Sequence, residues 1–149
     1  MPNRTRPVEP TPEAPGVLPT LVRAYVATVA GFEKQTGIHI ARWRILDVLH
    51  RYGEMPQHEL TRLTLIDPAA ISRILRDFVE FGDVARRHDP ADHRQSLVSL
   101  TPKGVEKTIG ISAARQRFVA AAIEGIDPAD LDRVEMTLRA LKANLARLT

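Results

Sequence analysis

The stretch from Asp67 to Gly104 constrains the fold more than any other part of this chain. Asp67 followed by Pro68 predicts the start of a helix, because an aspartate accepts hydrogen bonds from free N–H groups and proline fits the first helical position. The helix should end near Gly82, since glycine readily adopts the left-handed conformation found at helix C-termini. Its buried face should hold the apolar residues that recur at helical spacing, namely Ile71, Ile74, Leu75 and Phe78.

Two short strands are expected directly after this helix. The first covers residues 84–88 and the second covers residues 96–100. Residues 89–92 between them, Asp-Pro-Ala-Asp, are typical of a turn, and Thr-Pro at 101–102 starts another helix. A short helix, a two-stranded ribbon and a helix in this order predict a winged helix-turn-helix.

The predicted ribbon resembles the wing of the multiple antibiotic resistance regulator (MarR) family. The family pattern of Asp-x-Arg, a strand and Leu-Thr-x-x-Gly is matched by Asp92, Arg94, Leu100, Thr101 and Gly104. Two upstream family motifs, an aromatic-Arg-x-Leu helix and the helix before the recognition helix, are matched by Trp43, Arg44, Ile45, Leu46, Glu59 and Leu60. The resemblance extends by motif from Gly37 to Gly104 and implies a dimeric DNA-binding regulator of transcription.

The chain divides into four predicted parts. Residues 1–19 hold six prolines and few large apolar groups, which predicts a disordered arm over residues 1–17. Arg4 and Arg6 are the only hint that this arm touches DNA or a partner subunit, and a tail without a role is the alternative. A dimerisation helix is expected over 18–36, the winged helix-turn-helix domain over 37–101, and further dimerisation helices over 102–149.

The last predicted helix carries an apolar seam. Apolar residues follow each other at steps of three and four, as in a heptad repeat. This spacing favours a homodimer interface, although a core-facing stripe in a monomer would produce it as well. The residues of the seam are Leu131, Val134, Leu138, Leu141, Leu145 and Leu148.

The candidate DNA-binding residues lie on the predicted recognition helix and on the wing. On the helix, the face away from the core carries Pro68, Ala69, Ser72, Arg73 and Arg76. An arginine in the major groove can donate two hydrogen bonds to guanine. On the wing, Arg94 should enter the minor groove with Asp92 orienting it, while Arg86 and Arg87 should contact phosphates. The alternatives are a solvated helix face and a surface ion pair of little energetic value.

Members of the family commonly bind small aromatic or phenolic anions between the dimerisation and DNA-binding lobes. The resemblance therefore implies a ligand crevice, and a cationic group between aromatic walls would suit such a ligand. The alternative for Trp43 is ordinary core, and for His39 it is a helix start. The candidate residues are Tyr25, Phe32, His39, Arg42 and Trp43.

Composition excludes several other classes of protein. The absence of cysteine excludes disulfides, thiolate metal sites and a cysteine redox switch. No apolar run approaches the length of a membrane span and the N-terminus lacks the apolar core of a signal peptide, so a cytoplasmic protein is expected. The sequence contains no Gly-rich phosphate loop and no Gly-x-Ser-x-Gly, so neither an enzyme nor a cofactor is expected.

The distribution of charge and the placement of the histidines bear on the DNA-binding and metal-site hypotheses. The net charge of +3 is only mildly basic, and residues 67–104 hold six Lys and Arg against six Asp and Glu. The DNA hypothesis therefore depends on where the arginines point. A group of two imidazoles and two carboxylates at the wing turn suggests a metal site, but an exposed turn lacks supporting groups, and no metal is expected. This group is His88, Asp89, Asp92 and His93.

Together these features predict a mainly α winged helix-turn-helix homodimer with a two-stranded β-wing and long N- and C-terminal dimerisation helices. Its predicted function is to bind a pseudo-palindromic operator in double-stranded DNA and to repress transcription until a small aromatic ligand releases it. One alternative is a winged-helix protein-interaction module without a specific operator. A metal-responsive sensor is the more distant alternative.

Overall fold

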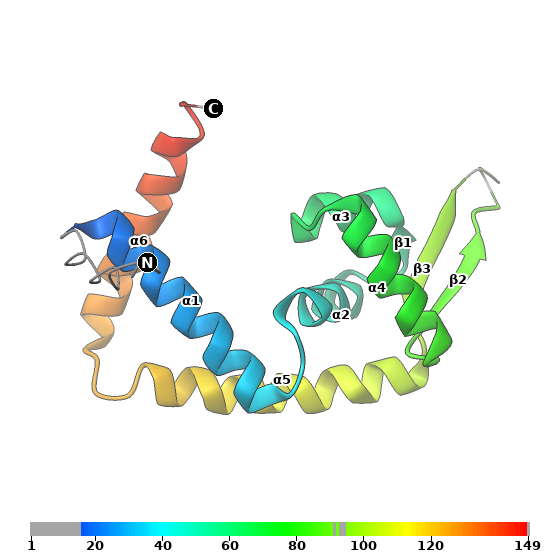
Figure 1. Ribbon diagram of the computed structural model, residues 1–149, viewed down its shortest axis with the longest axis horizontal. Coiled ribbons are helices and arrows are strands. Elements are labelled where there is room, and N and C mark those ends of the chain that lie inside the picture. The colour runs from blue at the N-terminus through cyan, green and yellow to red at the C-terminus, as the bar shows by residue number, and fades with distance from the viewer. Residues whose placement is uncertain (1–15, 91, 93–94, 149) are drawn as a thin grey trace, which may run out of the picture.

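The computed structural model describes residues 16–90, 92 and 95–148 and is mainly helical (Figure 1). Most of the predicted N-terminal arm, with Arg4 and Arg6, lies outside the described residues. The elements in chain order are α1 (Val17–Thr36), α2 (Ile40–Tyr52), β1 (Met55–Pro56), α3 (Gln57–Thr64), α4 (Pro68–Glu80), β2 (Val84–His88), β3 (Ser96–Leu100), α5 (Pro102–Ala122) and α6 (Pro128–Leu145).

Helix α5 connects two lobes of the molecule. It runs along one edge in Figure 1, with α1 and α6 at one end and the winged lobe, made of α2, α3, α4 and the strands, at the other. Side chains cap α4 and α5 at the helix starts that the sequence analysis expected, and a side chain caps α6 in the same way. Asp67 caps α4, Thr101 accepts from Gly104 N at 3.1 Å to cap α5, and Asp127 accepts from Ala129 N at 2.8 Å to cap α6.

The wing is an antiparallel sheet in the order β1-β3-β2. Val84 pairs with Leu100 and His88 pairs with Ser96, which confirms the predicted ribbon. The sequence analysis expected two strands, and the structure adds β1 on the open edge of β3, with Met55 opposite Val98. A two-residue strand that ends in proline carries no alternating pattern, so its sequence gives no signal for a strand.

The hydrophobic core lies in the winged lobe. Ile71, Leu75 and Phe78 on α4 are fully buried, as their spacing predicted, whereas Ile74 is only partly buried at the rim of the core. Helices α2 and α3 and the central strand β3 contribute the fully buried residues Ile45, Leu46, Leu60 and Val98. This shared core holds the recognition helix and the wing in one rigid unit.

Gly104 fixes the base of the wing against α5. A Cβ at this position would lie 2.0 Å from the backbone oxygen of Asp83, so only glycine allows this approach. The same oxygen accepts a 3.1 Å hydrogen bond from Thr101 N, and the buried Asp83 carboxylate is paired with Lys107. The Leu-Thr-x-x-Gly motif is therefore a packing requirement of the junction between β3 and α5.

Aromatic rings join α1 to the rest of the chain. The Phe32 ring lies 6.2 Å from the Trp43 ring and 6.3 Å from the Phe118 ring, centroid to centroid. Gly31 lets α5 approach, because a Cβ there would lie 2.8 Å from Phe118 Cε2. Phe32 and Trp43 are thus part of the packing between α1, α2 and α5.

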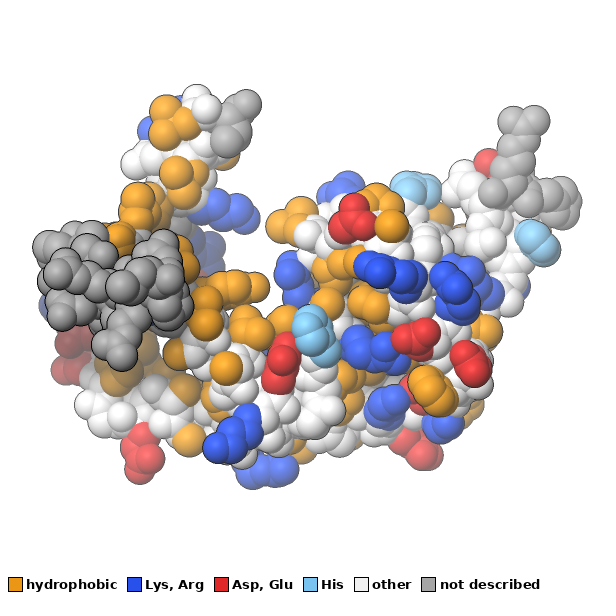
Figure 2. All heavy atoms as spheres, in the orientation of Figure 1, with side chains coloured by type: hydrophobic (Ala, Val, Ile, Leu, Met, Phe, Trp, Pro, Cys, Tyr) orange, Lys and Arg blue, Asp and Glu red, His pale blue; other side chains and the backbone are white. Residues whose placement is uncertain are grey.

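Helices α1 and α6 expose apolar side chains in the single chain. On α6, Leu131 and Leu141 are partly buried, whereas Val134 is 55% exposed. Leu148, the last residue of the predicted seam, lies beyond the end of α6 and is 82% exposed. Figure 2 shows hydrophobic side chains along the part of the molecule that holds α1 and α6. A hollow of about 580 Å³ lies between α1 and α6, with Leu21 and Leu138 among its lining residues. None of the described helices is long and apolar enough to cross a membrane.

Candidate nucleic-acid interface

The N-terminus of α4 is held by its own cap. Asp67 Oδ1 accepts hydrogen bonds from Ala69 N at 2.9 Å and Ala70 N at 3.1 Å. Pro68 occupies the first helical position, where no N–H is needed. This short-range chemistry positions the first turn, where Pro68 and Ala69 are exposed and small enough to let DNA approach.

The candidate reading face of α4 points away from the core. Arg73 and Arg76 are exposed, and Ser72 between them and the wing is partly buried. Neither arginine forms a hydrogen bond or ion pair within the part of the chain that the structure describes. Their guanidinium groups are thus presented to solvent on one helix face, and their contact with DNA stays a prediction.

Arg42 on α2 holds the recognition helix α4 in place through two contacts. Arg42 Nη1 donates to Asp77 Oδ2 at 2.7 Å, and the guanidinium carbon lies 4.7 Å from the centre of the Phe78 ring. The sequence analysis expected Arg42 in a ligand crevice. In the structure its charge is already paired, and its main contacts are with the recognition helix.

Arg86 on β2 is connected to α4 through the first residue of α3. Arg86 Nη2 donates to Gln57 Oε1 at 2.6 Å, and Gln57 Nε2 donates to Ser72 Oγ at 2.7 Å. The sequence analysis named Arg86 and Ser72 but not Gln57, which lies 15 residues before Ser72 and 29 before Arg86 and belongs to no recognisable motif. The three side chains join the wing, α3 and α4 in one polar chain.

Arg87 is held by an acidic partner. Its guanidinium makes a two-pronged ion pair with Glu54, including a 2.8 Å hydrogen bond from Nε to Oε2. The hydrogen bond from Arg87 lowers the pKa of Glu54 below its ordinary value, and the same bond raises the pKa of Arg87. A phosphate contact by Arg87 would therefore have to compete with Glu54.

The turn of the wing is closed by local hydrogen bonds. Gln95 Nε2 donates to Asp92 Oδ2 at 2.9 Å, and Gln95 N donates to Asp92 O at 2.9 Å. Arg94, the predicted minor-groove contact, and His93 lie outside the described residues. Among the residues that are described, no group of three His, Cys, Asp or Glu side chains converges as a metal site would require.

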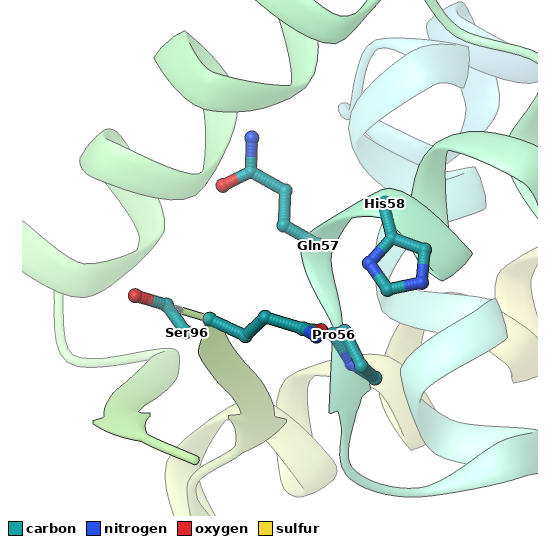
Figure 3. Close-up of a pocket in the computed structure, with 5 residues that line it drawn as sticks. Pro56, Gln57, His58 and Ser96 are labelled. Atoms are coloured by element: carbon teal, nitrogen blue, oxygen red, sulfur yellow. The ribbon is translucent and has the colours of Figure 1, made fainter. Parts of the chain in front are cut away.

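A polar hollow of about 280 Å³ lies where α3 meets the wing (Figure 3). It is lined by Pro56, Gln57, His58, Gln95 and Ser96. In Figure 3 the Gln57 side chain extends away from Pro56 and His58 at the start of α3. The winged lobe also carries many Lys and Arg side chains interspersed with Asp and Glu (Figure 2), in line with its even charge balance.

The five candidate ligand residues do not line one crevice. Tyr25, Phe32 and Trp43 line a cavity of about 190 Å³ between α1, α2 and α5. His39 and Arg42 line a separate hollow of about 310 Å³. His39 Nδ1 accepts from Ala41 N at 3.2 Å, so this imidazole is the N-cap of α2.

The sequence analysis missed residues of helix α5 that line both the cavity and the hollow. Arg115 and Phe118 complete the aromatic cavity, and Lys107 lines the hollow at His39. The aromatic cavity therefore has a cationic side chain after all, but it is Arg115 rather than Arg42. Arg115 and Phe118 are three residues apart and therefore share a helix face. This spacing is the sequence pattern that could have indicated that both line the cavity.

The fold, the capped α4 and its adjoining wing define a winged helix-turn-helix DNA-binding protein. Residues 36–95 match the sequence model of the MarR family. The chain is 34% identical over 95 residues to the uncharacterized HTH-type transcriptional regulator YdgJ of Bacillus subtilis, a match that covers 64% of this chain and 58% of YdgJ. It is 23% identical over 124 residues to the HTH-type transcriptional repressor IacR of Pseudomonas putida, covering 83% and 74% of the two chains.

A solved structure shares the same architecture. It concerns the regulation of DNA binding of Bordetella bronchiseptica BpsR by 6-hydroxynicotinic acid, and it superposes with a TM-score of 0.75 at 26% identity, covering 83% of this chain and 96% of BpsR. The chain belongs to the MarR family of transcriptional regulators. Membership also makes it a regulator rather than an enzyme, as the sequence analysis predicted.

Proposed function

We propose that this regulator acts as a homodimeric repressor that binds a pseudo-palindromic operator and is released by a small aromatic acid or phenol. The observation that carries the DNA-binding part is the exposed pair Arg73 and Arg76 on a helix that is capped, buried on its other face and flanked by the wing. Arginines on such a helix can donate to guanine O6 and N7 in the major groove.

Dimerisation is supported by the exposed apolar faces of α1 and α6. Val134 and Leu145 on α6 and Val22 on α1 are each 46–60% exposed in the single chain. A contiguous apolar surface of this kind is usually an interaction site. A two-fold dimer formed there would carry one recognition helix per subunit, and the two helices would enter major grooves about one turn of DNA apart.

Release by an aromatic acid is supported by the cavity between α1, α2 and α5. Phe32 and Trp43 supply apolar walls and Arg115 supplies a positive charge, a combination suited to an aromatic carboxylate. The DNA binding of BpsR is regulated by 6-hydroxynicotinic acid, which supports release by an aromatic acid, and IacR is a repressor, which supports repression. A ligand releases DNA only through its different affinity for the two states of the protein.

The route from this cavity to DNA passes through α2. Trp43 lines the cavity, and Arg42, the next residue toward the N-terminus, holds Asp77 of the recognition helix. A ligand that shifts α2 by a fraction of an ångström would therefore move the anchor of α4. Since two recognition helices must fit two grooves at once, a small change in their spacing weakens operator binding.

The test begins with selection of genomic DNA fragments by the purified protein. The enriched motif should be a two-fold repeat, and the complex should contain two chains per site by mass. Aromatic carboxylates and phenols are then screened for compounds that raise the melting temperature, and such a compound should weaken operator binding. Failure to enrich any motif would favour the protein-interaction module instead.

A further inference from the structure

Gln57 lies between the wing and the recognition helix and contacts both. Its amide oxygen accepts from Arg86 Nη2 at 2.6 Å, and its amide nitrogen donates to Ser72 Oγ at 2.7 Å. Gln57 itself is partly buried at the start of α3. This residue belongs to none of the predicted DNA contacts, yet it touches two of them.

The chemistry of arginine dictates which way the Gln57 amide faces. A guanidinium has only N–H donors and no acceptor, so the group that faces Arg86 must be the amide oxygen. The NH₂ group then necessarily faces Ser72. Because the amide donates, Ser72 Oγ accepts, and the hydroxyl proton of Ser72 is directed elsewhere.

That proton has no acceptor within the part of the chain that the structure describes, since Ser72 forms no other hydrogen bond there. Ser72 lies one residue before Arg73 on the recognition helix. In the major groove, acceptors are guanine N7 and O6, adenine N7 and thymine O4, whereas the donors are adenine N6 and cytosine N4. A serine that presents a proton is suited to the acceptors.

We infer that Gln57 is a specificity-determining positioning residue: through Arg86 it sets the polarity of Ser72, so that Ser72 donates to a base acceptor in each operator half-site. The inference rests on the proposed operator binding by α4. Gln57 acts through Ser72 and needs no contact with DNA of its own. The Arg86 guanidinium keeps further N–H groups that are free to reach a phosphate.

The substitution Gln57→Glu tests this polarity because it changes the hydrogen-bonding pattern and almost nothing of the shape. A carboxylate has no donor, so it would pair with Arg86 and accept the Ser72 proton as well. Ser72 would then offer DNA only its lone pairs. The preferred base at one position of each half-site should shift from one that presents an acceptor toward adenine N6 or cytosine N4.

The experiment compares enrichment from a randomised DNA library by the full-length parent, Gln57→Glu, Arg86→Ala and Ser72→Ala. The parent and Gln57→Glu should differ at a single half-site position by roughly tenfold in relative affinity. Arg86→Ala frees the amide to turn and should flatten the preference at that same position. Ser72→Ala should abolish it, and Gln57→Glu should have no further effect on preference in the Ser72→Ala background.

Equal melting temperatures for the parent and Gln57→Glu, with the same mass in solution, would show that the fold and assembly are intact. A merely structural role for Gln57 predicts lower affinity on every sequence with the same preferred bases, and that result would overturn the inference. If the parent enriches a motif that Gln57→Glu shares at every position, this inference fails while the proposed function stands. If the parent enriches no motif, the proposed function fails and this inference with it.

Discussion

Arg42 Nη1 donates a 2.7 Å hydrogen bond to Asp77 Oδ2, and this bond connects α2 to the recognition helix. The same guanidinium lies over the ring of Phe78, 4.7 Å from its centre. Arg42 therefore contacts two successive residues of α4 in two different ways. Substitution of Arg42 removes both contacts, whereas substitution of Asp77 removes only the ion pair. Comparing the two substitutions therefore separates the energetic contribution of the ion pair from that of the ring contact.

We expect Arg42→Ala to lower the free energy of unfolding more than Asp77→Ala does. The ion pair is partly exposed, with side chains 28% and 46% accessible, so its own contribution should stay below about 1 kcal/mol. Loss of the cation–ring contact should add about 0.5–1 kcal/mol to the cost of Arg42→Ala. Urea unfolding of both single variants and the double variant measures the difference, and equal losses would show that the ring contact contributes nothing.

Arg73→Ala and Arg76→Ala test the reading face. Each arginine is exposed, so its removal should leave the melting temperature unchanged. On a selected operator each change should cost about 1–3 kcal/mol of binding free energy, and much less on random DNA. Fluorescence anisotropy at fixed salt measures both affinities. An equal loss on both DNAs would assign that arginine to a phosphate contact.

Gly104→Ala should strongly destabilise the fold. The new Cβ would lie 2.0 Å from the backbone oxygen of Asp83, and backbone at the base of the wing cannot move aside as a side chain can. We expect a loss of at least about 2 kcal/mol in the free energy of unfolding. Gly110→Ala in the same helix is the matched control, because nothing lies within 4 Å of a Cβ there, and it should gain about 0.5–1 kcal/mol. Similar behaviour of the two variants would contradict the packing argument.

The pair of Glu54 and Arg87 should make stability depend on pH. The pKa of Glu54 is lowered in the folded protein, chiefly by the hydrogen bond from Arg87, so the unfolded chain binds its proton more readily. The contribution of this pair is thus fully present above the ordinary glutamate pKa of 4.5 and is lost as the pH falls through the lowered value. Glu54→Gln should reduce the loss of stability between about pH 5 and about pH 3. Thermal melts of the parent and Glu54→Gln across this pH range test the prediction. Parallel curves of melting temperature against pH would exclude the Glu54–Arg87 pair as a cause of the pH dependence.

Helices α4 and α5 could be predicted from the sequence because local chemistry sets where they start. Asp67 and Thr101 cap helices with their own side chains, and the buried face of α4 follows from spacing alone. Strand β1 could not be predicted, since Met55 and Pro56 form a strand only through their pairing with β3.

The candidate sites were harder to predict because they depend on residues far apart in the chain. Arg115 approaches Trp43 only when α5 packs on α1 and α2, so the cationic side of the aromatic cavity could not be assigned. Arg42 was expected to supply that charge, but Asp77, thirty-odd residues later, already pairs with it. Gln57 becomes visible only once α3, α4 and β2 meet.

The dimer interface is tested on α6. Leu138 lies on the heptad seam and lines the hollow between α1 and α6, and it is 37% exposed in the single chain. Leu138→Glu would place a charge in the proposed interface, where desolvation without a partner is costly. We expect the mass in solution to halve and tight operator binding to disappear, although no residue of the winged lobe has changed.

Ala140→Glu supplies the control for this substitution. Ala140 is exposed and lies two residues beyond Leu138, off the heptad seam of α6, so the same added carboxylate should stay in water. This variant should remain a dimer and keep its operator affinity. Sedimentation and DNA titration on the same samples relate assembly to binding. A parent protein that is monomeric at micromolar concentration yet binds a two-half-site operator tightly would rule out the proposed dimer, because a single recognition helix cannot occupy both half-sites.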